Sequence, residues 1–583
     1  MKEAATRAET VRDSAAKAWL RALQLTAPIK EHPERTLPAV IDELAAKFGD
    51  APALLSDHEC LTYRALAERS NQYARWALDQ GLGKGDAVGL FMANRPEYLA
   101  IWLGITKVGG VVALLNTNLA GPSLAHCIDI VAPKHIICGA GLRSRLTDLG
   151  RVWIEPDIEQ HSGEILTEDE RRPLTINDRA LCIYTSGTTG LPKAANVSHG
   201  RILQWGNWFA GMMDTHSTDR MYDCLPMYHS VGGVQAPVSV LLSGGSVVIC
   251  DKFSASQFWT DIARWDCTLF QYIGELCRYL LHHEASPGET LHRIRLACGN
   301  GLSPDVWRSF QDRFRIPKIF EFYAATEGAV SLFNVEGEIG AIGRVPSFLG
   351  HRAPAVLVRF DIDADEPIRD EQGFCIRCLP NEVGEAIGPF VSGASDVSTR
   401  FEGYINTEDS EGRIIRNVFR QGDAWFRTGD LMRKDERGFF YFVARIGDTF
   451  RWKGENVAAS EVSQAICEQP GVKQAIVYGV AIPNADGRAG MAALVLEGQL
   501  DLSAFRADLI KRLPGYACPL FLRIQKELEL TGTFKYTKTG LASQGYDPSQ
   551  TSDIIYFNHP ERQAFIPLDR MLCEQIESGV IRI

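Results

Sequence analysis

The stretch that decides the fold is residues 184–193, which read YTSGTTGLPK. It continues the apolar run LCIYT at 181–185, so the pattern predicts a buried strand that feeds a loop rich in hydroxyl groups. Glycines let backbone N–H groups approach an anion closely, hydroxyl groups add donors, and Lys193 adds positive charge. The G-x-x-x-x-G-K-[ST] spacing of a Walker A loop is absent. The stretch therefore predicts a phosphate-binding loop of a different kind.

Short apolar runs alternate with amphipathic stretches on both sides of this loop. The pattern predicts a helix at 98–110 and strands at 87–93, 111–116, 135–139, 181–185, 246–250 and 319–323. Such alternation is typical of the α/β class, with parallel-rich sheets covered by helices on both faces.

The pattern of apolar and polar residues changes after about residue 340. Strands are expected at 356–362, 374–378 and 439–443, with a hairpin turn at 435–438. A smaller α+β unit follows, with a helix at 459–469 and strands at 474–482 and 491–497. We therefore expect a large domain at 1–444, which includes a β-rich subdomain, and a small C-terminal domain at 445–583.

The amino-acid composition limits the classes of protein to which this chain can belong. The chain has 583 residues, a net charge of −11 and 45% apolar residues, so it is an ordinary globular protein without a general affinity for nucleic acid. Its 14 cysteines are thinly spread and suggest no disulfide framework, as expected in the cytoplasm. The sequence leaves the oligomeric state open.

The N-terminal 25 residues are too charged for a signal peptide and predict an amphipathic helix with apolar residues at Trp19, Leu20 and Leu23. Two interpretations stay open: the helix caps the fold, or it makes peripheral contact with a membrane. The apolar run at 101–115 is shorter than a membrane span.

Further motifs identify a family resemblance. They are ACGNGLSPDVW (297–307), EFYAATEG (321–328), FRTGDL (426–431), RIGDTFRWKGENVA (445–458) and TGTFKYTK (531–538). With the loop at 184–193 they resemble the adenylate-forming superfamily from about residue 35 to 545, most closely its very-long-chain acyl-CoA synthetase and fatty-acid transport protein branch.

The resemblance implies a role for each motif. It implies that Thr326 contacts the α-phosphate of ATP, that Glu327 coordinates Mg²⁺, and that His229 lies near the acyl pocket. It implies a catalytic lysine at Lys535 for adenylation and a glycine at Gly454 beside the pantetheine of CoA. The remaining implied contacts with ATP are Thr185, Ser186, Gly187, Thr188, Thr189, Gly190 and Lys193 for the phosphates, Gly299, Asn300, Gly301, Tyr323 and Ala324 for adenine, and Asp430 and Arg445 for ribose.

Two positions depart from the usual superfamily pattern. Phe534 stands where many members have glycine before the catalytic lysine, a form typical of the fatty-acid transport branch. Gly447 occupies the usual hinge position, where many members carry Asp or Lys. The resemblance implies that this hinge lets the small domain move between an adenylation pose and a thioester-forming pose.

The implied function is an ATP-dependent acyl-CoA synthetase that uses ATP, Mg²⁺ and CoA and activates a long-chain fatty acid through an acyl-adenylate. Three alternatives stay open. They are an adenylase that loads an acyl carrier protein, a ligase for a steroid-type carboxylate, and a transport or binding protein without turnover.

Overall fold

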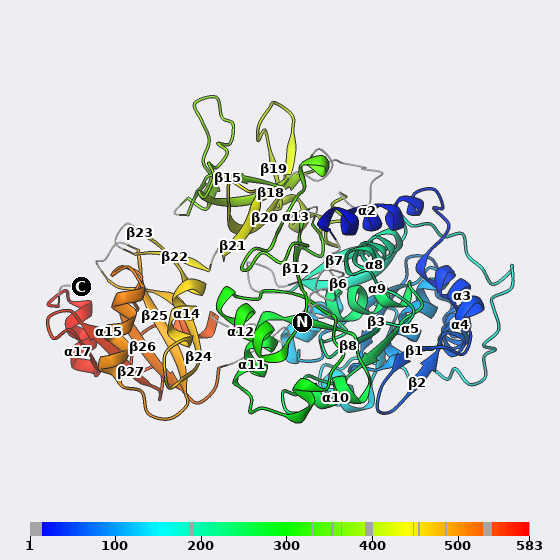
Figure 1. The fold of residues 1–583 in the computed structure, drawn as a ribbon, viewed down its shortest axis with the longest axis horizontal. Coiled ribbons are helices and arrows are strands. Elements are labelled where there is room, and N and C mark those ends of the chain that lie inside the picture. The colour runs from blue at the N-terminus through cyan, green and yellow to red at the C-terminus, as the bar shows by residue number, and fades with distance from the viewer. Residues whose placement is uncertain are drawn as a thin grey trace, which may run out of the picture. The chain divides into compact units, whose positions relative to one another are not determined.

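The computed structural model describes residues 14–185, 192–328, 330–350, 355–362, 364–390, 400–446, 448–452, 455–483, 487–528 and 539–581 (Figure 1). The chain divides into two compact units. Unit 1 comprises Met1–Ala355, Gly388–Arg416 and Asp423–Phe426, and unit 2 comprises Val356–Ile387, Asn417–Gly422 and Arg427–Ile583. The expected domain boundary between residues 444 and 445 stays a prediction.

Unit 1 contains two sheets whose central strands are parallel. In the first sheet, β12, β11, β10, β8, β9 and β1 are parallel neighbours in this order, and β2, β13 and β14 are antiparallel additions. The second sheet has the order β5-β3-β4-β6-β7, in which only β7 is antiparallel. This arrangement confirms the predicted α/β class.

The strands of the first sheet are β1 Pro52–Leu55, β2 Cys60–Thr62, β8 Arg220–Asp223, β9 Ser246–Ile249, β10 Leu269–Ile273, β11 Leu296–Asn300, β12 Ile319–Ala324, β13 Ser331–Asn334 and β14 Gly343–Arg344. Those of the second are β3 Ala87–Phe91, β4 Val111–Leu114, β5 His135–Cys138, β6 Arg179–Thr185 and β7 Lys193–Ser198. A further strand of unit 1, β19 Ile414–Arg416, pairs with the start of β20 Ala424–Lys434.

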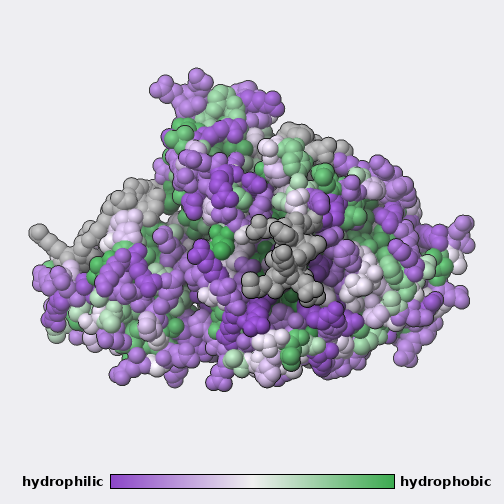
Figure 2. Space-filling model, viewed as in Figure 1, coloured by the Kyte–Doolittle hydropathy of each residue, from purple (hydrophilic) through white to green (hydrophobic). Residues whose placement is uncertain are grey.

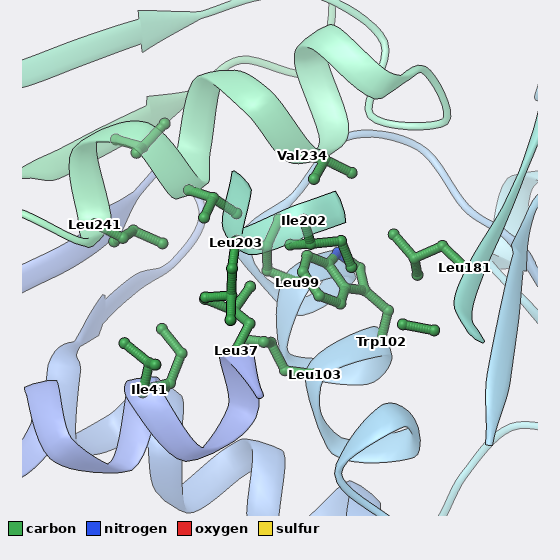
Figure 3. Close-up of a cluster of buried hydrophobic side chains, with 14 of the residues drawn as sticks. Leu37, Ile41, Leu99, Trp102, Leu103, Leu181, Ile202, Leu203, Val234 and Leu241 are labelled. Atoms are coloured by element: carbon green, nitrogen blue, oxygen red, sulfur yellow. The ribbon is translucent and has the colours of Figure 1, made fainter. Parts of the chain in front are cut away.

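Helices surround these sheets, and α5 is the most deeply buried of the long ones. Its sequence is apolar on nearly every face, with Pro96 at the start and Gly109 just beyond the end. Trp102 is fully buried among leucine and isoleucine side chains from α3, α8 and neighbouring elements (Figure 3). The α-helices of unit 1 are α2 Ala15–Thr26, α3 Leu37–Phe48, α4 Tyr63–Asp79, α5 Pro96–Lys107, α6 Gly121–Val131, α7 Arg143–Thr147, α8 His199–Met213, α9 Ala236–Leu241, α10 Phe258–Arg264, α11 Gly274–His282, α12 Pro304–Phe314 and α13 Thr407–Glu411.

Unit 2 contains a β-rich part and an α+β part built on a five-stranded sheet. Strands β15, β18, β20 and β21 are neighbours in this order, and the five-stranded sheet has the order β24-β25-β26-β27-β28, with β25 and β26 parallel. The strands are β15 Val356–Val358, β16 Phe360–Asp361, β17 Glu366–Pro367, β18 Val383–Pro389, β21 Phe439–Arg445, β22 Thr449–Trp452, β23 Glu455–Ala458, β24 Val472–Ala481, β25 Arg488–Leu496, β26 Phe521–Gln525, β27 Ile554–His559 and β28 Ala564–Pro567. The helices are α14 Ala459–Cys467, α15 Leu502–Arg512, α16 Thr539–Gln544 and α17 Arg570–Glu577.

One predicted strand of unit 2 is wrong. Residues 374–378 form only isolated bridges, in which Cys375 pairs with Arg369 and Arg377 pairs with Val358. Because the two bridges reach different partner segments, no continuous ladder forms. The predicted strand at 356–362 is also divided, into β15 and β16.

Hydrophobic residues form no large continuous patch on the face shown in Figure 2. On the face shown in Figure 2, hydrophilic residues dominate and the hydrophobic ones are scattered in small groups. Across the described part of the chain, no helix combines the length and apolar character that a membrane crossing requires.

The buried indole in α5 provides a test of the fold. Trp102→Ala should lower the free energy of unfolding of unit 1 by about 3–5 kcal/mol, because the fully buried ring leaves a cavity. Val152 is 87% exposed, so Val152→Ala should change the same quantity by less than about 0.5 kcal/mol. Urea unfolding followed by circular dichroism measures both; equal effects would contradict the packing described for α5.

Candidate active site

The base of the predicted phosphate loop is a closed hairpin. Strands β6 and β7 are antiparallel, and Thr185 stands opposite Lys193 at their ends. The loop residues Ser186–Gly190 lie outside the described residues. Lys193 Nζ is 2.9 Å from a carboxylate oxygen of Asp409 and 5.7 Å from the ring centre of Tyr404. The hairpin thus brings a cation and a hydroxyl group to the two ends of the loop.

Tyr404 connects this hairpin with the predicted metal ligand. Its hydroxyl group donates to Glu327 Oε1, and the Thr185 side chain hydrogen-bonds the same phenol. Burial and the adjacent carboxylate raise the pKa of Tyr404, so the phenol remains a donor at neutral pH. Glu327 itself is 7% exposed. Two motifs that are far apart in sequence therefore meet at one tyrosine.

A buried ion pair holds the segment that carries Tyr404. Residues 403–405 pair with β7. The Glu402 carboxylate accepts from the backbone N–H of Ser198 at 2.7 Å and lies 3.9 Å from the Arg201 guanidinium. Arg201 also donates to the Gly328 carbonyl oxygen at 3.4 Å. The start of α8, the Glu327 turn and the Tyr404 segment are thus tied together.

The predicted adenine residues lie at the carboxyl ends of β11 and β12. Gly299 and Asn300 end β11, and Tyr323 and Ala324 end β12, which is parallel to it. Ligands commonly bind beyond this edge of a parallel sheet. Gly301 has φ = +79°, a conformation that favours glycine.

Glu321 holds the loop after β11 in position by hydrogen bonding. It is fully buried, accepts from the backbone N–H of Leu302 at 3.1 Å, and accepts from the Tyr272 hydroxyl group. Burial raises the pKa of Glu321 to about 8. Gly299 must be small here, since a Cβ atom would lie 2.3 Å from the Tyr272 carbonyl oxygen.

A cavity of about 560 Å³ adjoins these residues. Its polar lining includes Ser230, Asn300 and Thr326, and the hydroxyl oxygens of Ser230 and Thr326 are 3.3 Å apart. Its apolar lining comes from aromatic and aliphatic residues of α2, α8, β12 and β13. Its volume is within the range of small-molecule sites. His229 directly precedes Ser230, half-buried with its ring centre 4.4 Å from that of Tyr228, and it does not line this cavity.

The other predicted site residues belong to unit 2. Asp430 on β20 stands opposite Arg445 on β21, with Arg445 Nε 3.6 Å from Asp430 Oδ1. Asp430 is 7% exposed. Gly454, Lys535 and the hinge residue Gly447 lie outside the described residues, and their predicted roles remain predictions.

Sequence reasoning missed four residues that organise the site: Arg201, Glu321, Glu402 and Tyr404. Glu321 begins the motif at 321–328 but received no predicted role, and the other three belong to no motif with its own spacing signal. Arg201 and Glu402 are recognisable only because both side chains are almost fully buried, which requires them to be paired.

Two family matches define the class of protein. The AMP-binding enzyme family matches residues 41–372, and the AMP-binding enzyme C-terminal domain matches residues 461–535. This chain belongs to the AMP-binding enzyme family.

Individual relatives show which members of the family this chain resembles. Long-chain fatty acid transport protein 1 of Mus musculus is 39% identical over 569 residues, which covers 93% of this chain and 88% of that protein. Long-chain fatty acid transport protein 6 of Mus musculus is 39% identical over 575 residues, which covers 94% and 92%. ATP-bound MatB from Rhodopseudomonas palustris shares the fold, with a TM-score of 0.72 and 23% identity over 87% of this chain and 98% of that chain.

The raised pKa of Glu321 gives a pH prediction. The unfolded carboxyl group loses its proton near its ordinary pKa of 4.5, whereas burial in the folded state raises this pKa to about 8. The folded state therefore binds more protons between these values, and stability falls as pH rises through this window, by roughly 1.4 kcal/mol per pH unit at most.

Glu321→Gln cannot titrate, so the variant should lose part of this decline between pH 5.5 and 7.5. Thermal unfolding at the two pH values measures the difference, and Glu284→Gln, at an exposed position, serves as the control. An unchanged pH dependence in Glu321→Gln would show that this carboxyl group is ionised throughout the range.

Proposed function

We propose that this protein is an ATP-dependent ligase that joins a long-chain fatty acid to CoA. In the first half-reaction a carboxylate oxygen attacks the α-phosphorus of ATP, pyrophosphate leaves, and an acyl-adenylate forms. In the second, the CoA sulfur attacks the acyl carbonyl carbon and AMP leaves with the bonding electrons. The names and extent of the similar proteins support the substrate class.

The observation that carries the proposal is the cavity of about 560 Å³. It joins Asn300 and Thr326, polar residues of the two nucleotide motifs, to aromatic and aliphatic side chains in one space. A fatty acid has this distribution of chemistry, with an ionised head and an apolar tail. Burial of the tail is worth about 0.8 kcal/mol per methylene group, so binding should favour long chains.

The phosphate and metal roles are assigned to unit 1. Thr185, Lys193 and the loop between them are proposed to hold the phosphates, and Thr326 the α-phosphate. Glu327 would hold Mg²⁺: within the described residues no cluster of three or more acidic, histidine or cysteine side chains is suited to a metal, which fits an ion held by one carboxylate and the nucleotide phosphates. When bound, Mg²⁺ would neutralise phosphate charge. Tyr404 keeps the Glu327 carboxylate oriented by its hydrogen bond.

The nucleoside roles follow from the donor and acceptor chemistry. Asn300 can donate to and accept from adenine, and Tyr323 offers a ring for stacking. Asp430, an acceptor of two hydrogen bonds, suits the vicinal hydroxyl groups of ribose, with Arg445 beside it at 3.6 Å.

Lys535 is proposed to stabilise the charge that builds between carboxylate and α-phosphate, and Gly454 to border the passage for pantetheine. A compact, mobile ammonium group suits the first role, and the absence of a side chain suits the second. His229 is proposed as a positioning residue near the acyl pocket.

We also propose a cytoplasmic location with peripheral membrane contact through α2. Leu20 and Leu25 on this helix are 52% and 44% exposed. Such residues can insert among lipid acyl chains.

One assay separates the proposed function from its alternatives. Pyrophosphate release should be measured over a panel of carboxylates, with and without CoA, and the products identified by mass spectrometry. We expect release that depends on long-chain acids and acyl-CoA only when CoA is present. Preference for a steroid acid, or thioester formed only on a carrier protein, would select the corresponding alternative; ATP and fatty acid bound without any pyrophosphate release would indicate a binding protein.

The two half-reactions should respond to different residues. Lys535→Ala should reduce adenylation by about 10²-fold or more, the scale for loss of a charge-stabilising group, yet still convert pre-formed acyl-adenylate and CoA into thioester. Gly454→Leu should do the reverse and accumulate acyl-adenylate, because its side chain obstructs the passage. Both half-reactions should be measured in both variants; an equal loss in both halves for each variant would contradict the separate roles.

A further inference from the structure

Helix α2 forms part of the wall of the proposed acyl cavity. The lining that contains Asn300 and Thr326 also contains Trp19, Leu20 and Leu23 of this helix. The family match begins only at residue 41, so α2 lies upstream of the segment that the AMP-binding enzyme family describes. The α2 part of the wall therefore lies outside the family match.

Helix α2 is held closely against α8, as Figure 1 shows. A Cβ atom at Gly211 of α8 would lie 2.5 Å from the backbone N and Cα of Ala22, so the two backbones meet without an intervening side chain. Arg21 Nε donates to the Gly211 carbonyl oxygen at 3.1 Å and lies 3.2 Å from Asp214 Oδ1. The helix therefore has a defined position from which to contact a ligand.

Helix α8 leads from the nucleotide motifs to α2. Arg201, in its first turn, contacts the carbonyl oxygen of Gly328 beside the Glu327 turn, whereas Trp208 contacts Trp19. These two positions of α8 both line the cavity, and they are about 10 Å apart along the helix axis at 1.5 Å per residue. An acyl chain must have several carbons to reach from one to the other.

The α2 end of the cavity is aromatic. The ring centres of Trp19 are 5.8 Å from those of both Trp208 and Phe333, with interplanar angles of 75° and 78°. Among the described residues, no hydrogen-bond acceptor contacts the indole N–H group of Trp19 or of Trp208. The faces and edges of these rings offer apolar contact, the two indole N–H groups are buried, and Gln24, Thr26 and Lys30 supply polar atoms to the lining beside α2.

The cavity also reaches the surface beside this helix, because Leu20, which lines it, is 52% exposed. Long tails are therefore not excluded by a closed end, and selection among them must come from the side walls. Leu23 is the aliphatic α2 side chain in the wall that is partly buried.

We infer that α2 is the chain-length determinant of this enzyme: the distal part of a long acyl tail lies against Trp19 and Leu23, and shorter acids do not reach them. This inference rests on the proposed function.

The first experiment compares Leu23→Trp with Leu25→Trp. Leu25 is on the same helix, 44% exposed and outside the cavity lining. Leu23→Trp should lower kcat/KM for stearate at least tenfold relative to the shortest acid that the wild-type enzyme turns over, since displacing the tail costs about fourfold per methylene group. Leu25→Trp should keep the wild-type ratio. Gly211→Val, which forces α2 away from α8, should also change the ratio for long acids.

The second experiment locates the bound acyl tail and does not require turnover. Stearate carrying a terminal diazirine should be photolysed in the full-length protein, and the labelled peptides identified by mass spectrometry. We expect label on residues 15–30, reduced by excess stearate. Label confined to other segments, or a wild-type acid preference in Leu23→Trp, would overturn the inference. If the wild-type enzyme activates no fatty acid at all, the proposed function fails instead, and photolabelling still decides whether a bound tail contacts α2.

Discussion

The buried pair between Arg201 and Glu402 is the constraint on which the site in unit 1 depends. The two side chains are 4% and 5% exposed, so each charge has lost most of its water and requires its partner. Arg400 Nη2 also lies 2.7 Å from Glu402 Oε1, so Glu402 keeps a cation if Arg201 is removed. Loss of Glu402 leaves the buried Arg201 guanidinium without the carboxylate it pairs with, a change that typically costs about 3–5 kcal/mol. The pair joins the first turn of α8 to the segment that carries Tyr404, and Arg201 extends the connection to the turn after Glu327. The position of the proposed Mg²⁺ ligand is thus set by residues remote from it in sequence.

Helix α8, which supplies Arg201, contacts a polar environment at its start and an aromatic one further along. Its first turn belongs to the polar nucleotide edge, where β11 and β12 end in Asn300 and Ala324. Two turns further on, Trp208 belongs to an aromatic cluster with Trp19 and Phe333. A substrate that is ionised at one end and apolar along the rest satisfies both environments at once, which is the physical basis for proposing a fatty acid. Neither environment alone would distinguish this substrate from an ordinary anion or an ordinary hydrophobe.

Much of the fold could be predicted from periodicity, because buried strands of parallel sheets are short continuous apolar runs. The runs at 87–93, 111–116 and 319–323 correspond to β3, β4 and β12. The prediction failed at 374–378, where the mostly apolar run FCIRC does not become a strand. Its residues reach two different partner segments, and a ladder requires one partner over several residues. Pairing partners are a tertiary property that a single segment does not encode.

The sequence by itself determined the local motifs of this protein. The run at 181–185 predicts the strand that feeds the phosphate loop, and the run at 319–323 predicts the strand that precedes Thr326 and Glu327, because apolar periodicity within a few residues decides each element. Only the tertiary structure decided that Tyr404 donates to Glu327, and that α2 lines the same cavity as Thr326. These contacts join residues separated by tens to hundreds of positions, and they exist because close packing and the pairing of buried charges brought distant segments together.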